Sequence, residues 1–496
     1  MTFDFILRGA TVVDGLGGEP FAADIGLEGP RIAAIGDLGQ DAGCEELDAR
    51  GLALSPGFID VHTHDDFAAL RHPDMSFKSR GGVTTCIVGN CGFGPAPYGA
   101  ACEMLRALTP GAEPPVYDGH AGYAAAVEAA EPGVNIGFLA GHGTLRLAVM
   151  GQAARAPEPS ELRQMQSLLR EALDAGALGL SSGLIYAPGR HAAREELIAL
   201  AAEMRGSGAL YATHLRDEAG GLLEAVDEAI EIGERAGVCV QISHHKAAGR
   251  DNWGQVQHSL ARIDAAQARG LHVHADQYPY TAGSTTLAAI LDNGAFQPGS
   301  RGGVGALAAE DVLIASCPGV SEWEGKTIAA LSKRLGRSPL TTAQAVFEKA
   351  PDTTVVLHMM SEADVQQVMR HPSTMIGSDG IPTLNGRPHP RLYNSFARVL
   401  GHYARDLGVL DLPTAVHRMT DFPARKFGLT DRGVVRAGAW ADLVLFEAEG
   451  IIDTGTYADP NRYPAGIRHV LVNGRFVMRD GVPTGARPGR LLRRSG

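Results

Sequence analysis

The sequence Gly57-Phe58-Ile59-Asp60-Val61-His62-Thr63-His64-Asp65 carries two histidines, two residues apart, at the end of a short apolar run. We expect residues 58–61 to form a buried strand, because the run is short and apolar. Side chains at positions i and i+2 of a strand point to the same side. The two imidazoles can therefore converge on one cation, and imidazole is a usual ligand of zinc. The motif predicts a metal site at a strand end.

Apolar strands alternate with helical stretches through the middle of the chain, from about residue 57 to residue 420. Residues 161–175 and 221–236 show the clearest helical periodicity. Alternation over this length predicts an α/β fold, a parallel (β/α)8 TIM-like barrel. The expected strands are residues 84–88, 134–139, 177–180, 209–212, 238–242, 272–275 and 354–357.

Both ends of the chain are rich in short strands and turns. We therefore predict one small β domain formed by residues 1–57 and 418–496, built around a barrel of residues 58–417. Residues from about 285 to 350 are longer than an ordinary loop and are predicted to form an insertion, or lid, over the site. The terminal strand signals lie at residues 6–15, 24–36, 441–446 and 469–478.

The composition excludes several kinds of partner. The net charge is -12, from 44 basic and 56 acidic residues, which argues against nucleic acids and anionic membranes because both require a basic surface. The six cysteines follow no disulfide or CxxC pattern. No apolar run approaches the roughly 18 residues of a membrane span, and the N-terminus lacks signal-peptide features. We expect a reduced, cytoplasmic protein, and the sequence leaves its oligomeric state open.

Polar residues follow several other predicted strands, at the end where a barrel carries its chemistry. A thiolate with imidazoles suits zinc, and an open coordination position lets zinc activate water. His245 is an alternative to its neighbour His244, because adjacent residues on a strand point to opposite sides. The candidate metal ligands are His62, His64, Cys91, His214, His244 and Asp379.

The segments that carry candidate ligands, residues 57–64, 89–92, 242–246 and 378–380, resemble the amidohydrolase superfamily and, within it, the N-acyl-D-amino-acid deacylases, or D-aminoacylases. Residues 141–146, 179–189, 276–280 and 389–391 share this resemblance. The resemblance covers nearly the whole chain. It implies zinc-dependent hydrolysis of an N-acyl-D-amino acid to a carboxylate and a free D-amino acid. It also implies one tightly bound Zn²⁺ on Cys91, His214 and His244, and a second, weakly filled position facing His62, His64 and Asp379.

The resemblance also assigns roles in catalysis and substrate binding. Asp379 would act as general base and then as general acid, taking a proton from water and passing it to the leaving amine. A substrate carboxylate suits the point charge of Lys and the two-pronged hydrogen bond of Arg. The matching residues are Lys246 and Arg391, with Tyr278 and Ser284 as hydrogen-bonding partners; Arg387 and Tyr280 are lesser alternatives to Arg391 and Tyr278.

Other functions stay open beside this one. The first is a cyclic-amide hydrolase of the hydantoinase or dihydroorotase type. Many such relatives bridge two metals with a carbamylated lysine between the first His pair and the third His, but this chain has no lysine between Ser79 and His245. The second is a metal-independent cysteine amidase with Cys91 as nucleophile. The third alternative is a binding protein without catalytic activity. The complete set of candidate metal ligands argues against it. The sequence does not decide whether the preferred D-side chain is apolar or acidic.

Overall fold

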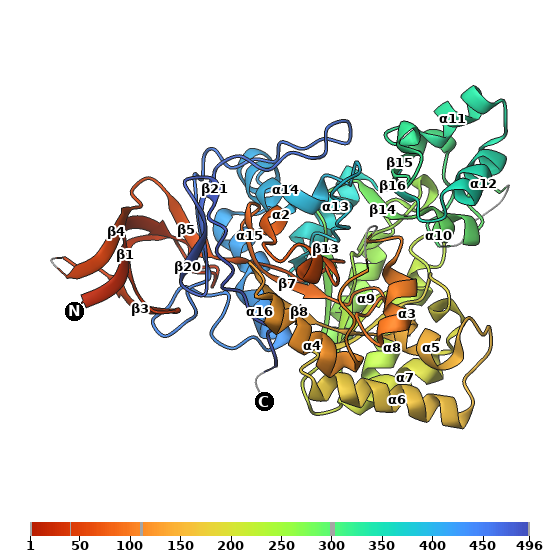
Figure 1. The fold of residues 1–496 in the computed structure, drawn as a ribbon, viewed down its shortest axis with the longest axis horizontal. Coiled ribbons are helices and arrows are strands. Elements are labelled where there is room, and N and C mark those ends of the chain that lie inside the picture. Colours follow the sequence, from red (N-terminus) through yellow and green to blue (C-terminus); the bar gives the residue numbers. More distant parts are fainter. Residues whose placement is uncertain (1, 40, 110–112, 298–302, 495–496) are drawn as a thin grey trace.

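A computed structural model describes residues 2–39, 41–109, 113–297 and 303–494 of the chain. Within these ranges eight parallel strands form the central barrel, which confirms the predicted (β/α)8 class (Figure 1). One of the eight is interrupted at Leu139 and so consists of β8 and β9. The strands are β6 (Phe58–Asp60), β7 (Val83–Val88), β8 (Asn135–Phe138), β9 (Ala140–Gly141), β10 (Gly179–Gly183), β11 (Leu210–His214), β12 (Cys239–Ile242), β13 (Val273–Gln277) and β17 (Thr374–Ile376).

Backbone hydrogen bonds join the two arcs of strands into one barrel. At one junction Leu139 N donates to Val88 O at 2.9 Å. At the other, beyond the end of β17, Asp379 N donates to His62 O at 2.7 Å. The second junction therefore places the segment that carries the histidine pair directly beside Asp379.

Helices cover the outside of the barrel, and their ends follow the capping residues in the sequence. The helix predicted at 161–175 is α6, which begins at Pro159 behind a capping box formed by Glu158 and Glu161. The helix predicted at 221–236 is α8, which ends before Gly237 with φ 72°. No helix in the described ranges is long and apolar enough to cross a lipid bilayer. Helices outside the barrel include α4 (Gly119–Ala130), α6 (Pro159–Asp174), α7 (Arg194–Ala201), α8 (Leu222–Ala236), α9 (Val256–Ala268), α13 (Glu362–Arg370) and α15 (Leu412–Met419).

The two ends of the chain build one β sheet beside the barrel, as the sequence predicts. Figure 1 shows the red N-terminal and blue C-terminal strands together on one side of the molecule. Strand β5 (Ala53–Pro56) pairs antiparallel with β18 (Leu443–Phe446), and this pairing joins the two halves. The limits at residues 57 and 418 stay predictions. The remaining strands are β1 (Thr2–Val12), β2 (Phe21–Glu28), β3 (Arg31–Gly36), β4 (Ala42–Asp48), β19 (Ile467–Val472), β20 (Arg475–Arg479) and β21 (Val482–Pro483).

An insertion between β13 and β17 forms its own antiparallel sheet, in the order β14-β16-β15. Strand β16 (Thr354–His358) belongs to this sheet, so the prediction of residues 354–357 as a barrel strand is wrong. Its apolar run is buried between two partners, and such a run looks the same in the sequence as a barrel strand. The other elements are β14 (Ala282–Thr286), α10 (Leu287–Asp292), β15 (Val312–Ser316), α11 (Ile328–Leu335) and α12 (Pro339–Lys349).

Candidate metal centre

The candidate ligands lie together at the carboxyl ends of the barrel strands, the end at which this architecture carries its functional groups. His62 and His64 follow β6, and Cys91 follows β7. His214 ends β11, and His244 lies two residues beyond β12. Asp379 follows β17. All six side chains are buried.

The histidine pair faces the carboxylate of Asp379. Strand β6 ends at Asp60, the chain bends at Val61 and His62, and an isolated parallel bridge then pairs Thr63 with Gly380. His64 Nε2 lies 3.2 Å and His62 Nε2 3.6 Å from Asp379 Oδ1. The two imidazoles therefore converge on this carboxylate, although the segment that carries them bends after β6.

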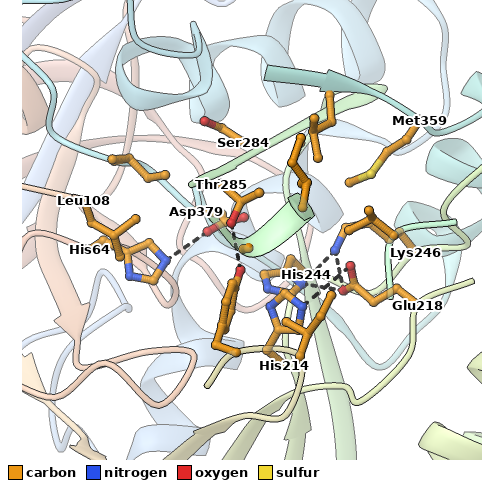
Figure 2. A pocket seen from close by; sticks show the side chains of 18 of the residues that line it. His64, Leu108, His214, Glu218, His244, Lys246, Ser284, Thr285, Met359 and Asp379 are labelled. Atoms are coloured by element: carbon orange, nitrogen blue, oxygen red, sulfur yellow. Dashed lines mark hydrogen bonds and ion pairs between the residues drawn. The ribbon is translucent and has the colours of Figure 1, made fainter. Parts of the chain in front are cut away.

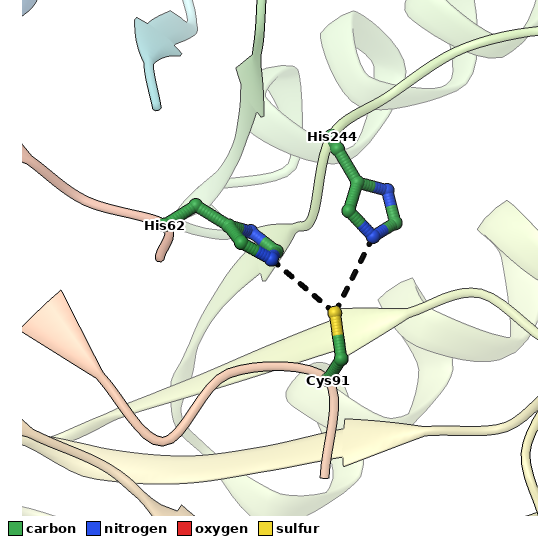
Figure 3. Close-up of side chains that lie close together, drawn as sticks. All are labelled: His62, Cys91 and His244. Atoms are coloured by element: carbon green, nitrogen blue, oxygen red, sulfur yellow. Dashed lines mark hydrogen bonds between the residues drawn. The ribbon is translucent and has the colours of Figure 1, made fainter. Parts of the chain in front are cut away.

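Cys91 joins this group through its sulfur (Figure 3). Its Sγ lies 3.2 Å from His62 Nε2 and 3.4 Å from His244 Nε2. Burial by itself would raise the pKa of the Cys91 thiol, but the charges of His62 and His244 outweigh burial and hold that pKa well below its usual range. The lowered pKa favours the thiolate, which is the form that binds metals.

Three of the candidate ligands have left-handed backbone conformations. The φ angles are 56° at Cys91, 35° at His244 and 49° at Asp379. A non-glycine residue in this region costs roughly 1–3 kcal/mol and is held there by its surroundings, often at a functional site. In the turn before Cys91, Gly89 has φ 81°, and a Cβ there would lie 2.2 Å from Leu139 O. Glycine is therefore required for the turn that directs the thiolate inward.

His214 carries the clearest sign that an ion belongs here. It is buried, neither of its ring nitrogens has a hydrogen bond, and its Nε2 lies 3.8 Å from Glu218 Oε2, beyond hydrogen-bond distance. Buried polar atoms without partners are rare in proteins, and a metal would satisfy this one. Three overlapping triads hold their donor atoms within 4.8 Å: His62, Cys91 and His244; His62, His64 and Asp379; and His214, Glu218 and His244. Imidazoles and a thiolate fit zinc.

The structure separates His244 from His245. His244 directs Nε2 at the thiolate, whereas His245 turns to the other side of the strand and its Nε2 lies 2.8 Å from Ser259 Oγ on α9. Burial lowers the pKa of His245 to about 4, so this imidazole is neutral. His245 therefore lies in the packing between barrel and helix, away from the candidate centre.

Asp276, at the end of β13, orients two of the candidate ligands. Its Oδ1 lies 3.2 Å from His62 Nδ1 and accepts the backbone N–H of His244 at 2.8 Å. Gln241 Nε2 donates to its other oxygen at 2.5 Å. A carboxylate on Nδ1 fixes the tautomer that leaves Nε2 free for a metal. Sequence reasoning did not select Asp276, although a carboxylate at a strand end was a usable signal.

Glu218 is a second residue that sequence reasoning missed. Figure 2 shows its carboxylate between His244 and Lys246. Its Oε1 lies 3.0 Å from His244 Nδ1 and 2.6 Å from Lys246 Nζ. Burial opposes its ionisation, but the charges of Lys246, His214 and His244 lower the pKa of Glu218 well below the usual value. Its position four residues after His214 was the available signal. Glu218 links a candidate metal ligand to a candidate substrate residue.

Lys78 fastens the histidine segment to the Asp379 segment. Its buried Nζ donates to Asp60 Oδ2 at 2.9 Å, to Thr63 Oγ1 at 2.8 Å and to Ser378 Oγ at 3.1 Å. These partners flank His62 on one side and Asp379 on the other. A buried charge needs such a full set of partners, and here the set fixes the distance between the two segments.

Arg391, the first residue of α14 (Arg391–Arg398), is buried beside the carboxylate of Asp379. Its Nη2 lies 2.9 Å from Asp379 Oδ2 and donates to Ser284 O at 3.3 Å. The guanidinium lies 4.4 Å above the centre of the Tyr278 ring. Its Nε and Nη1 have no hydrogen-bond partner. Arg391, Tyr278 and Ser284 therefore form one group, with two donors that an anion could use.

The two alternatives from the sequence, Arg387 to Arg391 and Tyr280 to Tyr278, lie elsewhere. Arg387 is exposed and its Nη2 donates to Ala458 O. The Tyr280 ring packs 5.0 Å from that of His389 and lies 4.8 Å beneath the guanidinium of Arg398. Neither residue lines the pocket that opens beside the candidate centre.

That pocket has one charged end, and its walls carry apolar side chains together with hydroxyl groups such as those of Ser284 and Thr285 (Figure 2). The charged end carries His64, His214, His244, Glu218, Lys246 and Asp379. The walls come from the loops after β7 and β10 and from the insertion, so the insertion lies over the site. The remaining lining residues are Phe93, Leu108, Ile185, Tyr186, Tyr278, Gly283, Ser284, Thr285, Ala289, Ile290, Asn293, Val304, Leu357, Met359 and Ile381.

A (β/α)8 barrel whose mouth gathers imidazoles, a thiolate and a carboxylate around a pocket defines a metal-dependent hydrolase. The amidohydrolase family model matches residues 45–478. The chain is 41% identical over 495 residues to D-aminoacylase from Alcaligenes xylosoxydans xylosoxydans, covering 99% of this chain and 98% of that protein. It is 40% identical over 491 residues to N-acyl-D-glutamate deacylase from the same organism, covering 99% and 96%.

A crystal structure of a deacylase is also similar to this chain over its whole length. N-acyl-D-glutamate deacylase from Bordetella bronchiseptica, complexed with zinc and a phosphonate mimic of the tetrahedral intermediate, matches with a TM-score of 0.90 and 38% identity, covering 99% of this chain and all of that chain. The chain belongs to the amidohydrolase family and, within it, to the group that contains the D-aminoacylases and N-acyl-D-glutamate deacylases.

Proposed function

We propose that this protein is a zinc-dependent deacylase that hydrolyses N-acyl-D-amino acids to a carboxylate and a free D-amino acid. The observation that carries the proposal is the buried convergence of Cys91, four imidazoles and Asp379 on one pocket, in a chain about 40% identical to deacylases of this kind over its whole length. The group beside Arg391 gives the same pocket a place for the free carboxylate of such a substrate.

The residues proposed to hold zinc are Cys91, His214 and His244 for the tight site, and His62, His64 and Asp379 for a weaker second one. Zinc in such a site polarises a carbonyl oxygen and lowers the pKa of water. The ring nitrogens of His214, which make no hydrogen bond, and the lowered pKa of the Cys91 thiol support this assignment. Asp276 and Glu218 hold two of the imidazoles in the required orientation.

Asp379 is the proposed proton carrier. Burial would raise its pKa, but Arg391 and the neighbouring histidines outweigh burial and hold the pKa of Asp379 well below its usual range. The carboxylate is thus ionised at neutral pH and accepts a proton from the attacking water at an Oδ atom. When the amide C–N bond breaks, it returns that proton to the leaving nitrogen, which departs as the amine of the D-amino acid.

Lys246 and Arg391 are proposed to hold the α-carboxylate of the substrate. Arg391 has two donors without partners, and Tyr278 packs between the two cations, 5.6 Å from Lys246 Nζ and 4.4 Å from the Arg391 guanidinium, measured from its ring centre. An anion held at two points fixes the scissile amide relative to Asp379, which supplies the proximity that catalysis needs. A cytoplasmic location and the lack of a nucleic-acid partner stay predictions from the sequence.

One observation favours a second candidate. The Cys91 thiolate in contact with His62 and His244 is also the pairing that a cysteine amidase would use. The two mechanisms differ in their need for metal. Removal of zinc with 1,10-phenanthroline should abolish hydrolysis of N-acetyl-D-leucine, and added zinc should restore it. Full activity of metal-free protein would favour the cysteine mechanism.

The proposed function is tested by a panel of N-acetyl-D- and N-acetyl-L-amino acids, with hydantoin and dihydroorotate as cyclic amides. We expect hydrolysis of the D-series, and no comparable rate on the L-series or on the cyclic amides. Zinc content is measured on the same preparation. Faster hydrolysis of a cyclic amide than of every N-acetyl-D-amino acid would contradict the proposal.

A further inference from the structure

We infer that the pocket selects N-acyl-D-amino acids whose side chains are uncharged and apolar, and discriminates against D-glutamate and D-aspartate. This inference rests on the proposed function and gives its substrate class. Identity to relatives does not provide it, because the chain is 41% identical to a D-aminoacylase and 40% identical to an N-acyl-D-glutamate deacylase. The composition of the pocket wall provides the substrate class.

The cations near the pocket are already matched by charges. Among the described lining residues, Lys246 is the one lysine or arginine, and its Nζ lies 2.6 Å from Glu218. Arg391, just behind the lining, lies 2.9 Å from Asp379. Every N-acyl amino acid brings an α-carboxylate that needs these two groups. A second carboxylate on the substrate would find no further lysine or arginine among the described lining residues.

The polar side chains of the walls away from the metal ligands, Ser284, Thr285 and Asn293 among them, are uncharged. The apolar side chains of these walls are Leu108, Ile185, Ile290, Val304 and Met359. Each of these five is less than 9% exposed. With the scissile amide at Asp379 and the α-carboxylate at Lys246 and Arg391, the acyl group and the D-side chain occupy the remaining space. Whichever wall the side chain meets, no described lining residue there offers it a positive charge, so the inference does not depend on which way the substrate lies.

Arg190 is the rival cation behind one wall. It is half-buried, and its Nη2 donates to Ile185 O at 2.9 Å and to Asn293 Oδ1 at 2.8 Å. These hydrogen bonds hold the guanidinium against the backbone and an amide that support the wall. Because its hydrogen bonds hold it against Ile185 and Asn293, we assign Arg190 to support of the wall and not to substrate binding.

The test compares a matched pair of substrates on the zinc-loaded full chain. N-acetyl-D-glutamine and N-acetyl-D-glutamate have nearly the same size and differ in charge, and N-acetyl-D-leucine serves as the apolar reference. Burying an unpaired carboxylate against an apolar wall is costly, so we expect kcat/KM for D-glutamate to be at least about 100-fold below that for D-glutamine. D-Leucine should equal or exceed D-glutamine.

A variant pair tests the wall itself. Met359→Lys replaces one unbranched side chain by another and adds a cation, so it should raise the ratio of D-glutamate to D-glutamine activity by about tenfold or more. Met359→Leu is the matched control and should leave that ratio unchanged. Arg190→Ala should also leave the ratio unchanged.

The outcomes separate the two proposals. If D-glutamate equals or exceeds D-glutamine in the wild type, or if Arg190→Ala selectively removes D-glutamate activity, the inference is overturned while the deacylase function stands. If no N-acetyl-D-amino acid is hydrolysed, the proposed function fails and the inference fails with it. If the wild type strongly prefers D-glutamine over D-glutamate and Met359→Lys reduces this preference, the result supports both the deacylase function and the inference.

Discussion

The guanidinium of Arg391 lies against the carboxylate of Asp379, with 2.9 Å between Nη2 and Oδ2, and both residues are buried. This contact joins the residue proposed to bind the substrate carboxylate to the residue proposed to carry the proton. Arg391 is the largest of the influences that lower the pKa of Asp379 against the effect of burial. The same arginine that lowers the pKa of Asp379 has two further nitrogens, Nε and Nη1, that make no hydrogen bond.

Asp379→Asn should abolish turnover and retain zinc in the tight site. The amide keeps the shape of the side chain but cannot accept a proton, and a positioned acid–base group contributes about 10²–10⁴-fold to the rate. The measurements are kcat and zinc per chain. Asp364→Asn is the control, because Asp364 is also buried but bonds the backbone of Gly254 on the outside of the barrel. Wild-type turnover in Asp379→Asn would refute its role.

Two cysteines of the same segment should respond differently to substitution. Burial raises the pKa of Cys86 on β7, so its thiol is neutral, whereas the pKa of Cys91 is lowered by His62 and His244 against the effect of burial. Cys91→Ala should lose the tight zinc and its activity. Cys86→Ala should retain both at some cost in stability. Equal zinc content in the two variants, measured after dialysis, would contradict the assignment of Cys91.

Glu218→Gln should weaken zinc binding and substrate binding together. Its Oε1 contacts both His244 and Lys246, and removing an outer partner of a metal ligand typically lowers metal affinity about 10–100-fold. We expect a raised KM in addition, since Lys246 loses its fixed position. The control is Glu228→Gln on α8, which is also buried but pairs with Arg216. Zinc affinity and KM both within twofold of wild type would exclude this coupling.

Most of the barrel could be predicted from the sequence because it depends on local patterns, and the six candidate ligands that the sequence proposes lie together in the structure. An apolar run followed by His62 and His64 specifies a strand end and a face. The residues that orient the ligands, Asp276 and Glu218, act through contacts between segments far apart in the chain. No local pattern reports such contacts, although each residue carried a weak positional signal.

Two ambiguities needed three-dimensional information for a different reason. His244 and His245 are chemically identical neighbours, and only the left-handed backbone at His244 determines which one faces the centre. The strand at Thr354–His358 has the apolar character of a barrel strand but is buried in the antiparallel sheet of the insertion. Burial alone does not identify the sheet to which a strand belongs.

Buried His274 should make stability depend on pH. Burial, with smaller effects from Lys426 and His272, lowers the pKa of His274 to about 3 from 6.5. The imidazole of His274 binds a proton more readily in the unfolded chain than in the folded protein. The stability that neutral His274 contributes is therefore fully present above pH 6.5 and is lost as the pH falls towards 3. Between pH 7 and pH 5 the loss is about 2 kcal/mol. His274→Leu should lose correspondingly less free energy of unfolding over this interval; an equal loss in both proteins would contradict it.

Cobalt substitution is the sharpest test of the proposal that the Cys91 thiolate is a ligand of a catalytic metal. The metal-free protein is reconstituted with one equivalent of Co²⁺, and its absorption spectrum and its hydrolysis of N-acetyl-D-leucine are recorded on the same sample. We expect an active cobalt protein with a thiolate-to-cobalt charge-transfer band in the near ultraviolet, and the loss of that band in Cys91→Ser. An active cobalt protein without the band, or with an unchanged band in Cys91→Ser, would contradict the account.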